Sequence, residues 1–340
     1  MFKKFLNVLK DTIKEEYKFI ITLLIIYCLL QIPLNYYIIV GGGISDVKSR
    51  IDVDNGNSSK GSFNISYVEE LKGTILTYGL SYIIPTWERE SANYYKYNEE
   101  ESIEDIEFRS DLDLTGANEK AKYWAYTLAN KDIKEKSSKM YVITILDGSD
   151  GSLKVQDEVL SIDGRSYDNL KDYIDYIQSL KEGDIVSIKL NRKGKEKTVK
   201  TKLFKSKGRL YTGVGMQQVI EYETNPDVNI KFKRGESGSS GGLITTLEIY
   251  NQLTKKDLTK GKKIAGTGTI EVDGSIGEIG GVEYKLLGAT RDKAEIFLVP
   301  AGRNYKQALK YKKKHNLDIK LIPVKNIKTA ITKLENIKWE

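Results

Sequence analysis

The hydrophobic positions of this chain begin with one long block and then recur at helix and strand periods. An uncharged run rich in Ile, Leu and Tyr extends from Phe19 to Val40. As a helix, a run of this length spans about 33 Å, enough to cross a bilayer. Lysines precede the run and charges of both signs follow it, and cationic flanks stay in the cytoplasm. The pattern predicts a cytoplasmic N-terminus over residues 1–18, a transmembrane helix over 19–41 and a chain that is extracellular beyond it.

A cleaved signal peptide is the alternative interpretation of this block. Gly41-Gly42-Gly43 supplies small residues near a conceivable cleavage site. The apolar region of a signal peptide usually has about 7 to 15 residues, which is shorter than this run. The length therefore favours an uncleaved anchor, and both interpretations place the rest of the chain outside the cytoplasm.

Residues 42–133 read as a juxtamembrane linker followed by one strand and one helix, which we expect to pack with the C-terminal domain. Residues 44–61 are polar, and an alternating segment at 62–68 predicts the strand. The helix is expected to begin at Thr115, a plausible cap. Its apolar residues recur at helical spacing, and they are Ala117, Ala121, Trp124, Ala125 and Leu128.

Residues 134–206 alternate strands with one amphipathic helix. Short apolar strands are predicted at 141–146, 159–164, 185–190 and 198–203, and Lys193-Gly194 suits the turn between the last two. The segment 167–180 carries apolar residues at helical spacing. A small β-rich domain with one helix is the expected fold.

The C-terminal segment, 207–340, contains a glycine-rich turn around three serines. Gly238-Ser239-Ser240-Gly241-Gly242 lies between a predicted strand at 228–232 and an apolar helix that starts at Gly241. The first turn of a helix presents unpaired N–H groups and the positive end of its dipole, which suits the binding of an oxyanion. We therefore expect Ser240 at a strand-to-helix turn, with backbone N–H groups of Gly238, Ser239 and Gly241 beside it.

Composition excludes several kinds of chemistry. The chain has one histidine, His315, beside a run of lysines, and one cysteine, Cys28, inside the apolar block. A Ser-His-Asp triad, cysteine catalysis, disulfides and thiolate metal sites are therefore not expected. The net charge of +7 is spread among acidic residues, so no nucleic-acid partner is expected. We also expect neither metal nor cofactor.

A serine nucleophile then needs a base other than histidine. A lysine can serve when burial destabilises its ammonium form and so lowers its pKa. Lys285 follows Gly280-Gly281 and lies between the apolar residues Val282 and Leu286. Thr267 offers a hydroxyl that can orient the amine. The residues alone leave open that Lys285 is a surface lysine and that the serine-rich turn is only a helix cap.

Two resemblances to known families narrow these alternatives. The segment 134–206 resembles a PDZ domain through Gln156-Asp157-Glu158-Val159-Leu160-Ser161-Ile162-Asp163-Gly164 and the helix that follows. In such a domain a peptide adds as a strand beside a receiving strand and a helix. The resemblance places the receiving strand at 140–146, with Tyr141 and Ile143 in the groove. A structural β domain without peptide binding is the alternative.

Residues from Gly213 to Pro300 resemble the proteolytic domain of Lon-type serine peptidases. The nucleophile turn, Gly266-Thr267-Gly268, Ile279-Gly280-Gly281 and Lys285-Leu286-Leu287-Gly288-Ala289 match that family in order. The resemblance implies that Ser240 is the nucleophile, Lys285 its base and Thr267 the residue that orients the amine. The chain differs from the family at Ser239 and Gly241, where a proline and an alanine are usual.

The order of segments resembles the membrane-anchored, PDZ-containing Lon-like peptidases of Gram-positive bacteria. The fold class implied is an α/β (α+β) Lon-type proteolytic domain with a PDZ-like β-rich domain and one N-terminal transmembrane helix. The function implied is a serine endopeptidase of flexible extracytoplasmic peptides, with substrates recruited by the PDZ domain. Such domains often form rings, so a homo-oligomer is compatible with the resemblance.

No phosphate-binding Gly-x-x-x-x-Gly-Lys-Ser/Thr motif occurs in these 340 residues, so we expect the activity to be independent of ATP. The alternative function is a catalytically inactive, membrane-anchored scaffold whose PDZ domain binds the tails of partner proteins.

Overall fold

The computed structural model describes residues 2–233 and 235–337 and divides them into two compact units. The N-terminal unit comprises residues up to Gly41 together with Val68–Tyr95. The main unit comprises Gly42–Tyr67 and the chain from Lys96 onward. Each unit is therefore built from segments that are not contiguous in sequence.

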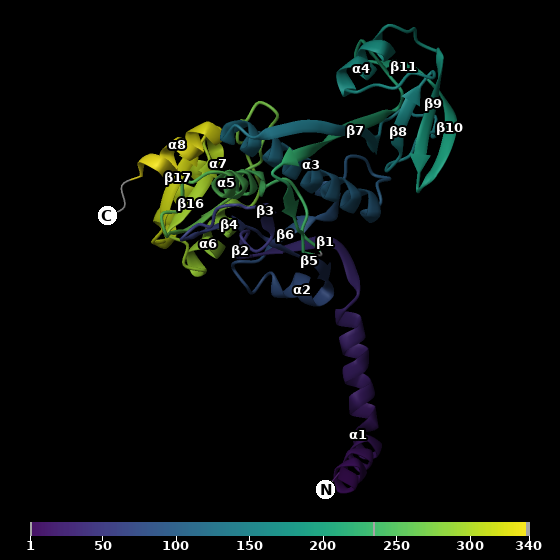
Figure 1. Cartoon of the computed structure of the whole chain (residues 1–340). Helices are drawn as coiled ribbons and strands as arrows, with labels where there is room; N and C mark the ends of the chain where they lie inside the picture. The colour runs from purple at the N-terminus through teal and green to yellow at the C-terminus, as the bar shows by residue number, and fades with distance from the viewer. Residues whose placement is uncertain (1, 234, 338–340) are drawn as a thin grey trace. The chain divides into compact units, whose positions relative to one another are not determined.

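The N-terminal unit joins a long helix, α1 (Phe2–Leu30), to a three-stranded antiparallel sheet (Figure 1). The central strand β1 (Pro33–Val40) pairs with β5 (Glu69–Thr74) and with β6 (Glu88–Ser91). A short helix, α2 (Ile75–Leu80), follows β5 and is capped by Thr74. A single 3₁₀ turn at Ala92–Tyr95 completes the unit.

The transmembrane helix predicted over 19–41 is not what the structure shows. Helix α1 ends at Leu30, and Pro33 opens strand β1. Proline has no N–H to continue a helix, and the last apolar residues of the block, Ile38 to Val40, are buried in the sheet. Within the described part of the chain we find no helix that combines the length and the apolar character needed to cross a membrane. The second half of the apolar block is thus a strand.

The main unit contains a five-stranded sheet in the order β17-β16-β15-β4-β2. Its strands are β2 (Ile44–Asp46), β4 (Ser62–Ser66), β15 (Lys263–Gly266), β16 (Ile296–Pro300) and β17 (Lys320–Val324). All neighbours run parallel except β2 and β4. Parallel strands are usually covered on both faces, and their sequences are correspondingly apolar throughout.

Helices cover both faces of this sheet. On one face, Ile264 and Leu298 pack with α5 (Gly242–Leu253) and α8 (Ile327–Asn336). On the other face, Ala265 and Phe297 pack with α6 (Val282–Arg291) and α7 (Arg303–His315). Because side chains alternate along a strand, adjacent residues serve the two separate cores.

Helix α3 (Ile103–Ala129) is longer than the sequence pattern indicated, and it packs against α5. Its N-cap is Ser102, whose hydroxyl accepts a hydrogen bond from the Asp105 N–H, while the Asp105 carboxylate accepts one from the Ser102 N–H. The prediction that the helix starts at Thr115 is therefore wrong. Thr115 lies in mid-helix, and its hydroxyl donates to the Asp111 carbonyl. The reciprocal capping box explains the earlier start.

A second sheet has the order β10-β9-β8-β7-β13 and a core of its own. Its strands are β7 (Asp132–Ile145), β8 (Glu158–Ile162), β9 (Ile185–Arg192), β10 (Lys195–Lys202) and β13 (Val214–Asn225). Helix α4 (Leu170–Gln178) and a hairpin of β11 (Phe204–Ser206) and β12 (Arg209–Tyr211) complete this PDZ-like domain.

Strands β7 and β13 form an antiparallel ribbon between the two halves of the main unit (Figure 1). Their pairing runs from Ile145↔Val214 to Asp132↔Asn225. β13 then continues through Pro226 into β14 (Val228–Ile230), which pairs with β3 (Ile51–Val53). The chain therefore enters and leaves the PDZ-like domain through one pair of strands, and the exit strand leads toward the serine-rich turn.

Candidate active site

Ser240 precedes the first residue of α5 by two positions, at the turn expected from the sequence. Gly241 is the N-cap, and every residue of α5 is buried. A Cβ atom on Gly242 would lie 2.7 Å from Ile270 Cγ2, and one on Gly241 would lie 2.9 Å from Ile65 Cδ1. At Gly242 the backbone N of Ile270 also lies only 3.0 Å away, so a side chain has no room there, whereas at Gly241 the end of the Ile65 side chain can move aside.

Lys285 brings its amine to the Ser240 hydroxyl. It lies on α6, is 5% exposed, and its Nζ donates to Ser240 Oγ at 2.9 Å. The same Nζ lies 3.3 Å from Thr267 Oγ1. The Lys285 carbonyl accepts a hydrogen bond from Ser66 Oγ at 2.7 Å, which fixes this turn of α6 to β4. A buried amine thus lies between two hydroxyl groups.

Thr267 follows β15 and is fully buried. Its N–H donates to the Leu298 carbonyl at 3.0 Å, and its Oγ1 donates to the Ser240 carbonyl at 3.2 Å. The Gly268 N–H donates to the same carbonyl at 2.8 Å. Two donors therefore hold the backbone of Ser240, while the Thr267 hydroxyl accepts from the lysine amine.

The three residues expected to bind an oxyanion differ in whether their backbone N–H groups already donate a hydrogen bond. The Gly238 N–H donates to the Ser110 carbonyl of α3 at 3.0 Å, so it is already engaged. The Ser239 carbonyl accepts from the Gly242 N–H at 3.1 Å, which closes the turn. Among the described residues, none accepts a hydrogen bond from the Ser239 or Gly241 N–H. These two groups are the better candidates for an anion site.

An ion pair that the sequence pattern did not indicate holds the loop before Ser240. The Arg50 guanidinium binds both the Glu236 carboxylate and the Ser45 hydroxyl. Glu236 also accepts from the Lys233 N–H at 3.0 Å. Arg50 lies 186 positions before Glu236 and in no recognisable motif, so only the tertiary fold reveals the pair.

A buried carboxyl group lies on α5, the helix that begins two residues after Ser240. Glu248 is 1% exposed, and burial raises its pKa above the ordinary value. Its Oε1 accepts from Gln252 Nε2 at 2.7 Å, whereas Oε2 has no partner among the described residues. Gln252 also binds the backbone of β3 at Ile51 and Val53. The group supports packing beneath the site and does not touch the reactive side chains.

The two residues predicted to line the PDZ groove do not lie on an edge strand of the sheet. Tyr141 and Ile143 lie on β7, which pairs with β13 on one side and, at Tyr141, with β8 on the other. The Ile143 carbonyl faces the Arg109 guanidinium of α3 at 3.4 Å. No free edge remains there to receive a peptide, because the strand order makes β13 the edge of the sheet.

A cleft of about 200 Å³ instead lies between α4 and the chain from β12 to β13. Its mostly apolar walls include Tyr173, Ile174, Ile177, Leu210, Val214 and Met216. Side chains of α4 make contacts across it: Tyr173 Oη lies 2.8 Å from Thr212 Oγ1, and Gln178 exchanges hydrogen bonds with the Leu210 backbone at 2.8 and 3.1 Å. Burial raises the pKa of Tyr173 to about 12, so its hydroxyl stays protonated.

Comparison with known protein families agrees with this division. Residues 131–203 match the family model of the PDZ domain. Residues 214–335 match that of the Lon protease (S16) C-terminal proteolytic domain. The chain therefore combines a PDZ domain with a Lon-like proteolytic domain. The strand β13 that borders the cleft lies outside the PDZ match.

Two curated relatives carry the name Lon protease. One, from Neorickettsia sennetsu, is 30% identical over 109 residues, and one from Xanthomonas oryzae pv. oryzae is 29% identical over the same length. The alignment covers 31% of this chain but only 13% and 12% of those proteins. The likeness is thus confined to one domain of the relatives.

Two solved structures that resemble part of the chain are PDZ domains. The PDZ domain of an SdrC-like protein from Listeria monocytogenes is 30% identical, and that from Listeria innocua is 32% identical. Each covers 23% of this chain, and the match covers 85% and 92% of those structures, with a TM-score of 0.22 in both cases.

Proposed function

We propose that the chain is a serine endopeptidase that works without ATP, with Ser240 as nucleophile and Lys285 as general base. The observation that carries the proposal is the 2.9 Å hydrogen bond from a buried amine to the Ser240 hydroxyl. Side chains with such geometry are the signature of an activated nucleophile. The Lon-like match over 214–335 supports the same assignment.

The reaction follows from the positions of these groups. Ser240 Oγ attacks the scissile carbonyl carbon and transfers its proton to Lys285 Nζ. The tetrahedral oxyanion is stabilised by backbone N–H groups at the start of α5. Lys285 then protonates the leaving amine as the C–N bond breaks, which leaves an acyl-enzyme. Water, deprotonated by the same amine, hydrolyses the ester, and Ser240 regains its proton.

Thr267 is proposed to position the amine. A lysine side chain has many rotamers, and a general base must remain within hydrogen-bond reach of the proton it takes. The Thr267 hydroxyl, held by its bond to the Ser240 carbonyl, accepts a second hydrogen bond from the same amine. Since only the neutral amine accepts a proton, cleavage is expected to become faster as the pH rises.

The PDZ domain is proposed to recruit substrates through the cleft between α4 and β13. An extended peptide adds to a free sheet edge and places alternate side chains in pockets. β13 is the edge strand, and the cleft beside it is lined by apolar side chains. A peptide with an apolar end is the expected ligand, and it must replace the contacts that Tyr173 and Gln178 make across the cleft.

Association with a membrane, with the N-terminus cytoplasmic and the catalytic domain outside the cell, stays a prediction of the sequence. Helix α1 exposes apolar side chains at successive positions, among them Phe19 at 60%, Leu24 at 56% and Tyr27 at 61%. Such a surface is costly in water and favours a lipid environment. Extraction of cell membranes with carbonate tests the association, and digestion of intact cells by an added protease tests the side on which the main unit lies.

The test of the activity uses the full chain with an unstructured protein such as β-casein. We expect cleavage by the wild type, none by Ser240→Ala, and near-normal cleavage by Ser237→Ala, a matched change in the same loop. Undiminished cleavage by Ser240→Ala would refute the assignment. No cleavage by any of the three, with peptide binding retained, would favour the scaffold instead.

A further inference from the structure

Strand β14 has one paired and one unpaired edge. On the paired edge, the Asp227 carbonyl accepts from the Asp54 N–H and the Lys231 N–H donates to the Arg50 carbonyl, both at 2.9 Å. Backbone groups alternate in direction along a strand, so those of Val228 and Ile230 point away from β3. Among the described residues, none forms a hydrogen bond with these outward groups. The edge is therefore open to another strand.

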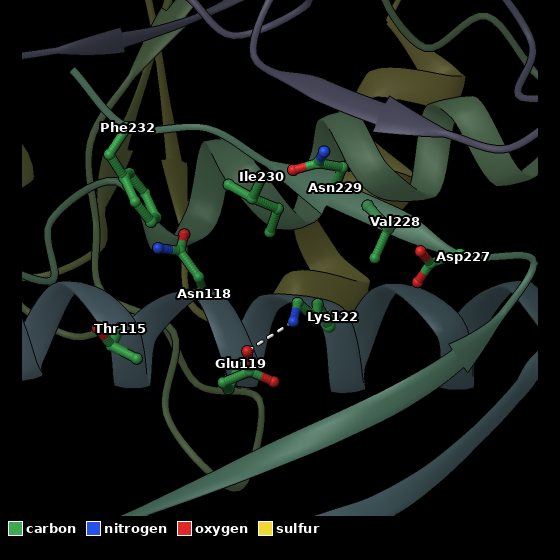
Figure 2. Close-up of a pocket in the computed structure, with 9 residues that line it drawn as sticks. All are labelled: Thr115, Asn118, Glu119, Lys122, Asp227, Val228, Asn229, Ile230 and Phe232. Atoms are coloured by element: carbon green, nitrogen blue, oxygen red, sulfur yellow. Dashed lines mark hydrogen bonds and ion pairs between the residues drawn. The ribbon is translucent and has the colours of Figure 1, made fainter.

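A cavity of about 360 Å³ is lined by residues of β14 and of α3. Figure 2 shows the strand and its continuation running above the helix, with Asn118 and Lys122 projecting from α3 toward it. The nine lining residues are Thr115, Asn118, Glu119, Lys122, Asp227, Val228, Asn229, Ile230 and Phe232. The cavity thus has two walls, one formed by α3 and the other by β14 and its continuation.

The polar side chains of the helical wall are occupied by partners within the protein. Lys122 Nζ donates to Glu119 Oε1 at 2.6 Å, and Glu119 Oε2 accepts from the Tyr222 N–H at 2.9 Å. Asn118 Nδ2 donates to the Leu114 carbonyl at 2.8 Å. The groups left to bind a ligand are mainly the backbone N–H and C=O of the strand. Recognition through them depends on an extended backbone and little on side-chain identity.

The cavity lies close to the nucleophile loop. The Gly238 N–H donates to the Ser110 carbonyl of α3 at 3.0 Å. Thr115, at the near end of the cavity wall, is five residues further along that helix, a distance of about 7.5 Å along its axis. At the other wall, β14 continues through Phe232 into the same loop, and the Phe232 ring is 47% exposed. Helix α3 and the continuation of β14, which form the two walls, therefore both lead toward the turn that contains Ser240.

From these observations we propose that an extended segment of the substrate polypeptide binds in this cavity as an added strand on the free edge of β14. The proposal rests on the proposed function, since it assigns the substrate's binding site to the Ser240 turn. A segment bound here runs along β14 toward the loop and delivers its scissile bond to Ser240. A folded segment cannot bind, because its backbone groups are already paired. The cavity thereby selects unfolded chains of varied sequence.

A matched pair of substitutions on α3 tests the site. Thr115 lines the cavity, whereas Thr127 is also exposed on α3 but lies outside it. We expect Thr115→Trp to fill the cavity and Thr127→Trp to leave it open. In the Ser240→Ala chain, a fluorescein-labelled unstructured peptide with an amidated C-terminus is titrated with each variant, and anisotropy reports binding. The amide removes the free carboxylate that a PDZ groove can capture.

The expected result is at least tenfold weaker binding for Thr115→Trp and no change for Thr127→Trp. With Ser240 intact, Thr115→Trp raises the KM for β-casein by a similar factor and leaves the labelling of Ser240 by a small fluorophosphonate unchanged. Equal binding by the two tryptophan variants, with equal thermal stability, overturns the site. Failure of the wild type to cleave, with Thr115-dependent binding retained, overturns the proposed function and leaves the site as a peptide-binding cleft.

A second probe tests the backbone character of the contact. Methylation of alternate peptide nitrogens removes donors from one edge of the ligand strand at a time. We expect one alternating set to abolish binding and the other to be tolerated. Equal tolerance of both sets would contradict strand addition.

Discussion

The nucleophile site and the PDZ cleft differ in what their hydrogen bonds do in the resting protein. At the nucleophile site, the bonds among Ser240, Thr267 and Lys285 already hold the arrangement that the proposed reaction needs. In the cleft, the bonds of Tyr173 and Gln178 span the space that a peptide would enter. The first set of bonds preorganises a reaction, whereas the second must be exchanged on binding. The groups of the proposed reaction are therefore already in position in the resting protein. The proposed binding of a peptide in the cleft instead requires existing hydrogen bonds to break.

The largest expected effect comes from removing the amine without disturbing its surroundings. Lys285→Met keeps the length of the buried side chain and removes the base. We expect the rate of casein cleavage to fall by about 10³-fold, as for loss of a general base. Circular dichroism and the thermal midpoint should remain close to those of the wild type. Retained cleavage would show that the fixed arrangement is not a catalytic one.

A smaller effect is expected from Thr267→Val, which replaces the hydroxyl by a methyl group of similar shape. The change removes the acceptor for the lysine amine and the donor to the Ser240 carbonyl. We expect kcat to fall by about 10-fold to 100-fold, since a misplaced base is costly, with little change in KM. Thr267→Ser should restore much of the rate. Equal loss in both variants would indicate a packing role instead.

A substitution in the PDZ cleft should weaken peptide binding and leave kcat unchanged. Ile174→Glu places a carboxylate in the apolar wall, and Ile185→Glu is a control on an exposed position outside the cleft. Using a fluorescein-labelled peptide with a free apolar C-terminal residue, we expect about tenfold weaker binding for Ile174→Glu alone. The kcat for a short fluorogenic peptide should be unchanged in both. A change in kcat would mean that the two sites are coupled.

The smallest effect concerns stability beneath the nucleophile. Because burial raises the pKa of Glu248, the folded state binds a proton more tightly than the unfolded state. The contribution of Glu248 to the free energy of unfolding therefore falls as the pH rises above the ordinary pKa of glutamate and through the raised pKa of the folded protein. Glu248→Gln should remove that dependence and stabilise the fold by about 1 kcal/mol at neutral pH. Urea denaturation of the wild type and of Glu248→Gln at pH 4.5 and pH 7.5 measures both effects. A variant less stable than the wild type at pH 7.5 would contradict the prediction.

The same contrast explains what could be predicted from the sequence. Ser240, Thr267 and Lys285 lie within 45 positions, in glycine-rich turns whose residue types reflect close backbone approach. The PDZ cleft depends on which strand lies at the sheet edge, and that follows from long-range pairing of β13 with β7. The sequence predicts a helix over residues 33–40 because an apolar run that forms a helix cannot be told by pattern from one that forms a buried strand. Arg50 carried no local signal, since its partner Glu236 is remote in sequence.

The ribbon of β7 and β13 is the place where the PDZ-like domain joins the rest of the main unit. Ser138 and Lys139 pair with Ile220 and Val219, so the two strands are already in hairpin register where the PDZ-like domain begins. A hairpin tip is where a chain best tolerates an inserted domain, because both ends of the insert start close together. The PDZ-like domain therefore has the architecture of an inserted module. Replacing residues 140–218 by an Asn-Gly turn should leave a protein that retains the two cores around its parallel sheet.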